Sequence, residues 1–217
     1  MSIKIDNITF RYDKKSAPVL YDFSAEFVDG QMTALTGKNG SGKTTLSRVI
    51  MGILKAETGS VLIDGEDSKS LSLAETGRRI GYVMQNPARQ IFSTSVREEI
   101  MYGLENLGLE DEEKESRAKE YLDYFDLSGR EDDFPFSLSH GEKQRLVLAS
   151  VLAMKPNWLM LDEPTASLDY MRREQLGEYL LKINREQGCG IIIISHDRDF
   201  VERYTKDRVK IEGGSHV

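Results

Sequence analysis

Residues Gly37–Thr44 read GKNGSGKT and fit the pattern G-x-x-x-x-G-K-[ST], which is typical of a loop that wraps around nucleotide phosphates. The preceding residues 31–36, QMTALT, predict a buried strand. After the loop, apolar residues from Leu46 to Ile53 recur at i, i+3, i+4 and i+7, the spacing of one helix face. A loop that joins a strand to a helix is the context that the pattern requires, so this stretch predicts a phosphate-binding turn rather than a glycine-rich connection without a ligand.

The residue types in the loop suit a polyphosphate. Glycines let successive backbone N–H groups turn inward, and the following helix adds the positive end of its dipole. Lys43 is expected to reach the outer phosphates, and the Thr44 hydroxyl is expected to bind the accompanying magnesium ion. The predicted nucleotide-binding residues in this stretch are Gly37, Asn39, Gly40, Ser41, Gly42, Lys43, Thr44 and Thr45.

Composition limits the class of protein. A chain of 217 residues predicts one large domain or a domain with a subdomain, and a net charge of -7 disfavours general nucleic-acid binding. The single cysteine, Cys189, excludes an internal disulfide framework and lies between two glycines, which predicts a small buried side chain. The first residues lack the profile of a signal peptide, and no apolar run approaches the roughly 20 residues of a membrane helix, so we expect a cytoplasmic location.

Hydrophobic periodicity predicts an α/β fold. Apolar residues alternate with polar ones in the first sixty or so residues, which predicts an antiparallel sheet beside the phosphate loop. The alternating residues are Ile3, Ile5, Phe23, Ala25, Phe27, Val61 and Ile63. The uniformly apolar runs 158–161 and 191–194 predict strands of a parallel sheet that helices cover on both faces.

The middle of the chain reads mainly as helix. Ser95–Glu98 fits a capping box at a helix start, residues 118–125 predict an amphipathic helix, and Glu142–Met154 is apolar nearly all round, which predicts a buried helix. We therefore expect a single domain over residues 1–217. Within it, residues 1–84 and 155–217 form a nucleotide-binding core with a β subdomain, and residues 85–154 form a helical subdomain.

Two carboxylates follow a predicted buried strand, at Asp162 and Glu163. In a parallel sheet the carboxyl ends of the strands share an edge, so we expect both side chains near the phosphate loop. Asp162 is expected to help hold magnesium, and Glu163 to orient the water that attacks the terminal phosphate. The alternative is that the pair only ends a strand, and the phosphate loop upstream favours the functional interpretation.

Nearly the whole chain resembles the ATP-binding subunits of ABC transporters, with the motifs in the family's order. Residues 134–145, FPFSLSHGEKQR, resemble the signature motif, and residues 167–169 and 194–197 resemble the D-loop and the switch-histidine segment. Gln85 matches the Q-loop glutamine, and Tyr12 matches the aromatic residue that stacks on adenine. The resemblance implies a P-loop ATPase core with a mainly parallel sheet, an N-terminal antiparallel β subdomain and an inserted α-helical subdomain.

Roles for these residues follow from their positions. His196 comes after an apolar strand, so its imidazole can reach the γ-phosphate and stabilise the charge that develops there. Gln85 can contact both magnesium and the attacking water, because its amide both donates and accepts. Together with Lys43 and Glu163, these are the predicted catalytic residues. For Tyr12 the alternative is an ordinary strand aromatic.

The signature motif implies a second subunit. In this family Ser139 and the Gly141 backbone would face the γ-phosphate held by the other subunit, so that two subunits enclose each ATP. The resemblance thus adds Ser139, Gly141, Glu142 and Asp169 to the nucleotide-binding residues. His140 and Glu142 replace the family's usual Gly and Gln. A bulkier residue and an anion there are expected to weaken nucleotide closure, which leaves open an asymmetric dimer with a better-matched sister subunit.

A subtype is also indicated. Residues 85–92, 95–100 and 105–109 resemble the energy-coupling factor ATPases, which serve importers of vitamins and of cobalt or nickel ions. The resemblance implies that a transmembrane coupling protein docks near Gln85 to Ile100. The chain would then lie at the cytoplasmic face of the membrane as a peripheral subunit.

The predicted function is ATP hydrolysis, with ATP and Mg²⁺, that energises a membrane importer together with an identical or homologous ATPase subunit and without nucleic acid. One alternative is a soluble ABC-type ATPase, but the sequence shows no coiled-coil insertion, tandem cassette or basic face. Another is a low-turnover regulatory subunit, which His140 and Glu142 favour. The sequence contains no Asn-Lys-x-Asp segment for reading guanine, which disfavours a GTPase.

Overall fold

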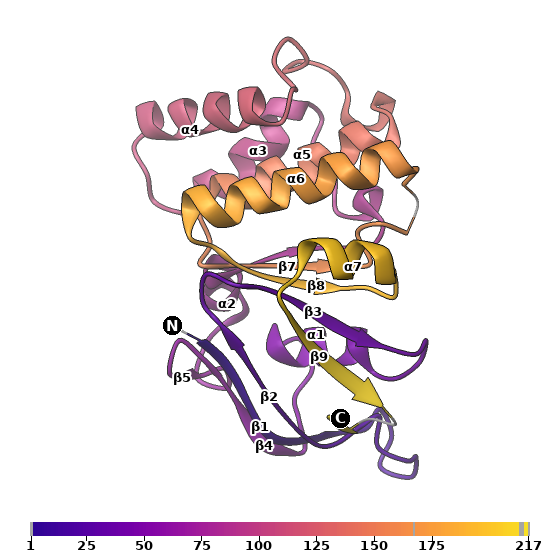
Figure 1. Ribbon diagram of the computed structural model, residues 1–217. Coiled ribbons are helices and arrows are strands. Elements are labelled where there is room, and N and C mark those ends of the chain that lie inside the picture. The colour runs from indigo at the N-terminus through magenta and orange to yellow at the C-terminus, as the bar shows by residue number, and fades with distance from the viewer. Residues whose placement is uncertain (1, 167, 213–214, 217) are drawn as a thin grey trace. The chain divides into compact units, whose positions relative to one another are not determined.

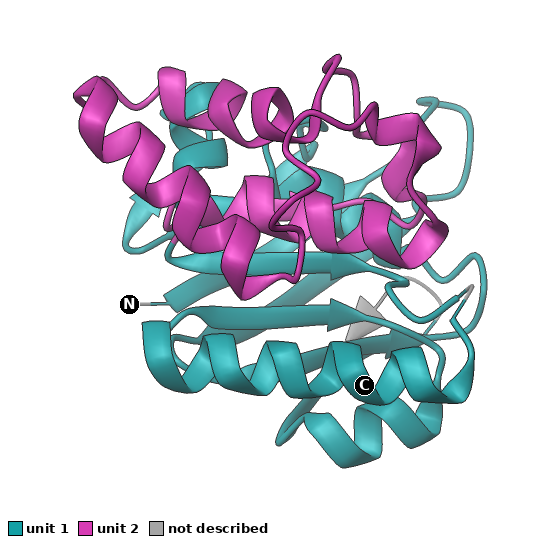
Figure 2. Cartoon of the chain, turned by 90° about the horizontal axis from the view of Figure 1, so that it is seen from above, with its two compact units in different colours: residues 1–80, 157–217 teal, residues 81–156 magenta. Residues whose placement is uncertain are grey.

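The computed structural model describes the backbone of residues 2–166, 168–212 and 215–216. The chain forms two compact units, of which unit 1 comprises residues 1–80 and 157–217 and unit 2 comprises residues 81–156 (Figure 2). Unit 1 holds two sheets with their helices, and unit 2 is mainly helical. The predicted α/β fold with an antiparallel sheet, a mainly parallel sheet and a helical insertion is confirmed.

The antiparallel sheet of unit 1 has the strand order β2-β1-β4-β5. Its strands are β1 (Ser2–Phe10), β2 (Leu20–Val28), β4 (Thr58–Ile63) and β5 (Glu66–Asp67). Ile3 and Ile5 of β1 are buried, and Ile3 lies opposite Phe27 of β2 and Ile63 of β4. The alternation in the sequence therefore predicted this sheet correctly, because every second side chain of a strand points to the same face.

The mainly parallel sheet of unit 1 has the strand order β10-β9-β3-β8-β7. Its strands are β3 (Met32–Gly37), β7 (Trp158–Asp162), β8 (Gly190–Ile194), β9 (Asp207–Glu212) and β10 (Ser215–His216). All residues of β7 and β8 are buried, as their apolar runs predicted. Leu35 of β3 and Asp162 of β7 both pair with Ile194 of β8, so the carboxyl ends of these three strands meet at one edge (Figure 1).

Unit 1 also contains α1 (Lys43–Ile50), α2 (Leu73–Arg79), α6 (Tyr170–Gln187) and α7 (Arg198–Tyr204). Helix α1 follows β3 and the phosphate loop, as predicted, but it is shorter than the periodicity indicated. Met51 is its C-cap, and Gly52 then adopts a left-handed φ of 71°, a conformation that ends a helix. Ile53 therefore lies outside the buried helix face and is 57% exposed, so the prediction for this residue was wrong.

Unit 2 begins within β6 and continues as helices joined by loops. Its elements are β6 (Ile80–Val83), η1 (Pro87–Arg89), α3 (Val96–Glu105), α4 (Asp111–Tyr124), η2 (Pro135–Ser137) and α5 (His140–Ala153). Helix α5 is buried along most of its length, as predicted, but it begins at His140 and not at Glu142. At α3 only half of the predicted capping box forms, because Glu98 accepts hydrogen bonds from Thr94 instead of from Ser95.

The one cysteine is inert at neutral pH. Cys189 is 3% exposed, and burial, with a smaller effect from the charge of Asp29, raises the pKa of its thiol to about 12. A thiol with this pKa stays protonated, and the thiolate is the reactive form. The prediction of a small buried side chain is confirmed.

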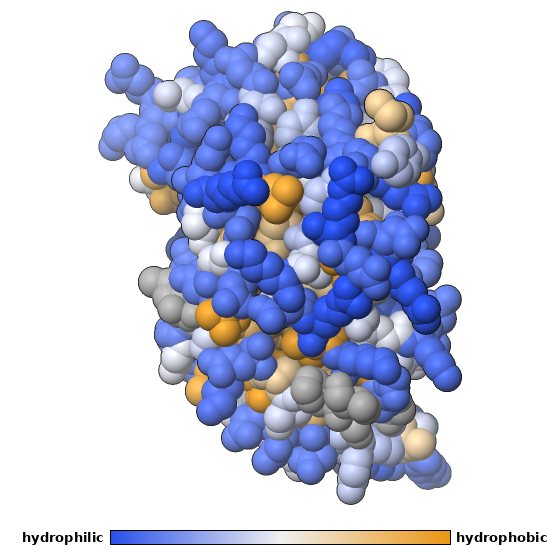
Figure 3. Space-filling view, viewed as in Figure 1, coloured by the Kyte–Doolittle hydropathy of each residue, from blue (hydrophilic) through white to orange (hydrophobic). Residues whose placement is uncertain are grey.

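On the face shown in Figure 3, hydrophilic side chains predominate and apolar ones form small separate spots. Among the residues that the structure describes, none of the helices is both long enough and apolar enough to span a lipid bilayer.

Candidate nucleotide site

The glycines of the phosphate loop are required by its packing. A side chain at Gly37 would come within 2.5 Å of Ser41 Oγ and 2.6 Å of the Ile211 carbonyl oxygen. Gly42 adopts a left-handed φ of 104°, and a Cβ there would lie 3.1 Å from the Val19 carbonyl oxygen. The loop therefore folds back on itself at Gly37, and its last glycine lies against the start of β2, an arrangement that only glycine permits.

The interior of this loop is suited to an anion. The Lys43 ammonium donates to the carbonyl oxygens of Gly37 at 2.9 Å and Lys38 at 3.2 Å, and Lys43 is only 7% exposed. Ser41 Oγ is buried and has no hydrogen-bond partner within the described parts of the chain. A buried hydroxyl without a partner is costly, and a phosphate oxygen would satisfy it. A positive charge and an unsatisfied donor thus lie on one short loop.

The phosphate loop meets the first carboxylate at the sheet edge. Thr44 Oγ1, on the first turn of α1, donates to Asp162 Oδ2 at the end of β7, over 3.3 Å. Asp162 is 7% exposed. A hydroxyl and a carboxylate are ligands that Mg²⁺ accepts, and this ion commonly takes its other ligands from phosphate and water. The described residues contain no group of three or more His, Cys, Asp or Glu side chains that could hold a metal by themselves.

The second carboxylate contacts the predicted switch histidine. Glu163 Oε2 lies 2.8 Å from His196 Nδ1, and the His196 backbone N–H donates to the same oxygen at 3.4 Å. Glu163 has a left-handed φ of 48°, and its N–H donates to the Ile194 carbonyl oxygen at 2.8 Å. Such a conformation is strained for a residue with a side chain, and strain of this kind concentrates at functional sites. The contact between Glu163 and His196 therefore joins the ends of β7 and β8.

Tyr12 lies just beyond β1, which ends at Phe10, so it is not a residue of the strand itself. Its hydroxyl hydrogen-bonds Thr45 Oγ1 on α1 over 3.1 Å, and its ring meets the Phe10 ring edge-on with centroids 4.9 Å apart. Tyr12 remains 60% exposed. An exposed aromatic ring fixed beside the phosphate loop can serve as a stacking platform for a base.

Asp169, the predicted D-loop residue, is the N-cap of α6. Its Oδ1 accepts from the Arg172 N–H at 2.9 Å, and its side chain is 60% exposed. The neighbouring Ser167 lies outside the described residues. Asn39 and Gly40 are exposed residues of the phosphate loop.

The remaining predicted residues belong to unit 2. Gln85 is exposed and follows β6. Ser139 is the N-cap of α5, and Gly141 lies in the first turn of this helix. Unit 1 thus brings together the phosphate loop, both carboxylates, His196 and Tyr12, while Gln85 and the signature residues occupy the separate helical unit.

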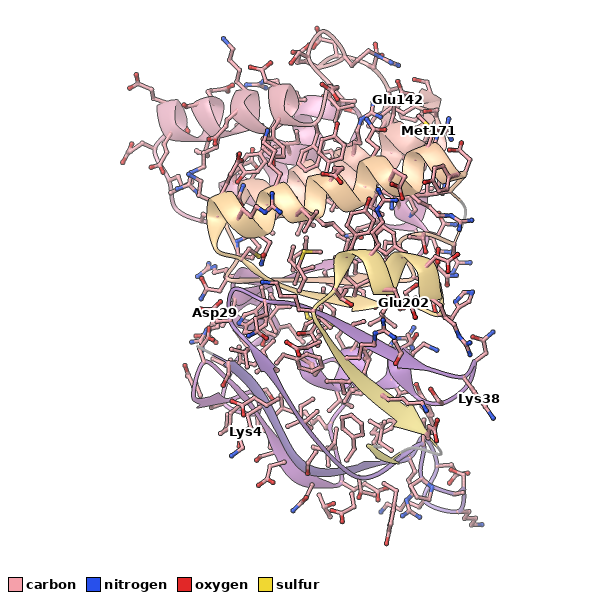
Figure 4. All side chains as sticks on the ribbon, in the orientation of Figure 1. Lys4, Asp29, Lys38, Glu142, Met171 and Glu202 are labelled. Carbon is pink, nitrogen blue, oxygen red and sulfur yellow. The ribbon has the colours of Figure 1, made fainter. Side chains whose placement is uncertain are left out.

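Two residues hold the Glu142 carboxylate, and the S-x-x-E spacing from Ser139 to Glu142 is the sequence signal for one of them. Glu142 (labelled in Figure 4) completes a capping box, because its Oε2 accepts from the Ser139 N–H at 2.8 Å while the Glu142 N–H donates to Ser139 Oγ at 3.4 Å. Its other oxygen accepts from Arg130 at 2.7 Å. The hydrogen bonds from Ser139, and then the charge of Arg130, lower the pKa of Glu142. Arg130 therefore pairs with the anion that was expected to weaken nucleotide closure.

We expect Glu142→Gln to leave the stability of the chain nearly unchanged. Glu142→Ala should lower the free energy of unfolding by about 1 kcal/mol, because the Ser139 N–H loses its acceptor while Ser139 remains the N-cap. Glutamine can form the same capping box, whereas alanine cannot. Denaturant unfolding of the two variants measures the difference. If Glu142→Gln lowered the free energy of unfolding as much as Glu142→Ala does, the ion pair with Arg130, and not the capping box, would be the main contribution of Glu142 to stability.

A second arginine missing from the sequence-based site is Arg173, in the first turn of α6. It donates to the Leu168 carbonyl oxygen and to Asp197, the residue after His196. Neither arginine follows from the sequence, because each joins segments that are distant along the chain and no spacing rule connects them.

A glycine loop with an inward-held lysine joins a strand to a helix, and an Asp-Glu pair lies next to it at the end of a parallel strand. This arrangement defines a P-loop nucleotide-binding domain. A family profile described as ABC transporter matches residues 20–166. The chain therefore belongs to the ABC transporter family, as an ATPase domain.

Two curated relatives show how close the match is. A putative ABC transporter ATP-binding protein of Pyrococcus furiosus is 42% identical over 199 residues, covering 92% of this chain and 75% of the relative. The energy-coupling factor transporter ATP-binding protein EcfA1 of Thermotoga maritima is 39% identical over 202 residues, covering 93% and 75%.

Solved structures of ABC transporter ATPases have the same fold as this chain. The cbiO1 protein of Clostridium perfringens, described as part of the ABC transporter complex cbiONQ, has a TM-score of 0.92 at 32% identity, covering 99% of this chain and 86% of that one. A dimeric ATP-binding cassette, MJ0796, in a post-hydrolysis state with ADP and Pi, has a TM-score of 0.85 at 25% identity, covering 99% and 96%. The predicted family and its ATPase activity are confirmed.

Proposed function

We propose that this chain binds ATP with Mg²⁺ at the candidate nucleotide site and hydrolyses it, together with a second ATPase subunit, to energise a membrane importer of the energy-coupling factor class. The observation that carries this proposal is the contact of Glu163 with His196 at the sheet edge where Thr44 meets Asp162. One edge thus gathers an anion-binding loop, a cation-binding pair and an acid–base pair.

The binding roles follow from the contacts. Lys43, Ser41 and the loop N–H groups would hold the phosphates, since the Lys43 ammonium is held inside the loop and the buried Ser41 hydroxyl lacks a partner within the described residues. Thr44 and Asp162 would hold Mg²⁺, which supplies positive charge that offsets the charge of the phosphates. Tyr12 would stack on adenine, because its ring is exposed and held by Thr45 and Phe10.

Glu163 and His196 divide the hydrolytic work in this proposal. The Glu163 carboxylate orients and polarises the attacking water as a general base. The His196 imidazole, held by that carboxylate, stabilises the charge that develops on the terminal phosphate. Gln85, from unit 2, would contact the magnesium ion and the water. The same proposal assigns nucleotide binding to the core, residues 1–84 and 155–217, and the Q-loop and signature residues to a helical subdomain, residues 85–154.

A second ATPase subunit, identical or homologous, would complete each site. Gly141 lies in the first turn of α5, where backbone N–H groups have no acceptor within the helix and can bind an anion. With Ser139, Glu142 and Asp169 it would face the nucleotide of the partner. The pairing of Glu142 with Arg130 supports this role, because a screened carboxylate repels a phosphate less than an unscreened one.

A membrane component would dock on the segment from Gln85 to Ile100. Phe92 in this segment is 60% exposed and meets Tyr102, 54% exposed, with ring centroids 4.6 Å apart. Beside this pair, the buried Glu99 accepts from the N–H groups of Phe92 and Ser93 and so holds the backbone of the segment. Exposed aromatics on a fixed loop are typical of a protein interface. The chain would then lie at the cytoplasmic face of the membrane.

The test is to isolate the tagged chain from membranes in mild detergent, to identify the proteins that accompany it, and to measure ATP hydrolysis by the chain alone and mixed with candidate sister subunits. Co-isolation of an integral membrane protein with a homologous or identical ATPase is expected. Recovery of the chain with soluble proteins only would favour an ABC-type ATPase without a transporter. Turnover only after mixing would indicate an asymmetric pair.

A further inference from the structure

Arg173 joins two segments of the nucleotide site. It lies in the first turn of α6, and its Nε donates to the Leu168 carbonyl oxygen at 3.0 Å. Its Nη1 donates to Asp197 Oδ2 at 3.2 Å. Arginine can hold two acceptors at once because its donors are arranged in a planar fork, and lysine lacks this geometry. The side chain therefore connects the turn before α6 with the segment that carries His196.

The Asp197 carboxylate is the anchor of the His196 segment. Its Oδ1 accepts from the Phe200 N–H at 3.2 Å and so caps α7, while its Oδ2 takes the bond from Arg173. The Asp197 N–H donates to Ser195 Oγ at 3.0 Å, and Ser195 is fully buried. Both neighbours of His196 are thus held in place, although the His196 side chain itself is 59% exposed.

We propose that Arg173 is a positioning residue for ATP hydrolysis, which acts through Asp197 to hold the His196 imidazole against Glu163. The inference rests on the proposed roles of Glu163 and His196. Because the His196 imidazole is exposed, its orientation depends on the backbone that carries it and on its contact with Glu163. Loss of the bond between Arg173 and Asp197 would therefore allow the segment that carries His196 to shift. Displacements of about 1 Å at a reacting centre can lower the rate by up to about a hundredfold.

Arg173 could instead only fasten α6 to its surroundings. The two interpretations differ in what they predict for Asp197→Asn. Asparagine caps a helix as well as aspartate does, so this variant keeps the α7 cap and loses the charge that Arg173 binds. If Arg173 only fastened α6, loss of its ion pair with Asp197 would lower stability and leave kcat of the folded enzyme unchanged.

The experiment measures kcat for ATP hydrolysis and the affinity for ATP in Arg173→Ala, Arg173→Lys, Asp197→Asn and the double variant Arg173→Ala with Asp197→Asn. Arg185→Ala removes an exposed arginine from the last turn of the same helix and serves as the control. Arg173→Ala is expected to lower kcat about tenfold with ATP affinity within about twofold, since the phosphate loop is untouched. Asp197→Asn should have a similar effect, and the double variant should be no slower than the slower single variant.

Arg173→Lys should restore only part of kcat, because one ammonium cannot reproduce both edges of the fork. Multiplicative losses in the double variant, or a kcat within twofold of the parent for Arg173→Ala, would overturn the inference. His196→Ala is measured in parallel. If His196→Ala hydrolyses ATP at the parent rate, the proposed function of His196 fails and the inference fails with it. If His196→Ala is inactive while Arg173→Ala is normal, only the inference fails.

Discussion

Replacement of Glu163 by glutamine is expected to lower steady-state ATP hydrolysis at least about a hundredfold and to leave ATP binding intact. General acid–base catalysis by one side chain typically contributes about 10²- to 10⁴-fold. Glutamine has the size and shape of glutamate but cannot accept a proton from water. Hydrolysis is measured as phosphate release at saturating MgATP, and binding is measured by equilibrium titration.

The geometry supports a clean substitution. Glu163 already adopts a left-handed φ of 48°, which glutamine and glutamate tolerate equally, and its N–H keeps the bond to Ile194 in either case. The amide of glutamine can still hydrogen-bond His196 Nδ1, so the imidazole is not left without a neighbour. The variant therefore removes the general base and keeps the contacts of the nucleotide site. As a result, we expect a dimer with bound ATP to accumulate.

Glu202→Gln is a matched control for this variant. Glu202 (labelled in Figure 4) is an exposed residue of α7, whose carboxylate lies 3.7 Å from Arg208. The control makes the same chemical change in the same unit and should hydrolyse ATP at the parent rate. Hydrolysis by Glu163→Gln at the parent rate would remove Glu163 from the mechanism.

Much of the fold could be predicted from the sequence because burial leaves a regular trace. The run Ile191–Ile194 places apolar side chains on both faces of a strand, which predicts that both faces are covered, and it forms the fully buried β8. The alternation through Ile3 and Ile5 likewise indicated one buried face. The helix that follows the phosphate loop was placed correctly, but its end was not, since Gly52 stops α1 before the periodic residue Ile53 is reached.

The candidate site was only partly predictable. Lys43, Thr44 and the Asp-Glu pair belong to local patterns whose spacing is fixed by the turn they form. The contacts of Arg130 with Glu142 and of Arg173 with Asp197 join residues on separate elements, so they depend on tertiary packing that no local pattern encodes. The left-handed φ of Glu163 is also invisible in the sequence, because no local pattern marks it and its N–H bonds a residue of another strand, Ile194.

The effect of the Glu142 charge depends on such a tertiary contact. A carboxylate without a partner, at a helix start that faces a phosphate, would repel that phosphate. In the structure the carboxylate is divided between a capping bond to Ser139 and an ion pair with Arg130. Acidic residues near a helix N-terminus are favourable for the helix itself. The departure from the family's usual glutamine therefore keeps the cap.

Replacement of Lys43 by alanine is expected to reduce the affinity for ATP by about 10- to 150-fold. A hydrogen bond to a charged group contributes about 1.5–3 kcal/mol, and about 1.4 kcal/mol corresponds to a factor of ten in affinity. Lys43 is only 7% exposed, and its ammonium is held by the Gly37 and Lys38 carbonyl oxygens inside the loop. No other side chain of the loop carries a positive charge that is held inward.

Lys38→Ala provides the matched control, because it removes the same charge from the same loop. Lys38 is exposed, and Figure 4 shows its side chain directed away from the sheet. Only its backbone carbonyl takes part in the loop, and alanine keeps that group. Equilibrium titration with MgATP should therefore show near-parent affinity for Lys38→Ala and a large loss for Lys43→Ala. Equal losses would mean that the loop attracts ATP by its overall charge, and parent affinity in Lys43→Ala would contradict the direct phosphate contact.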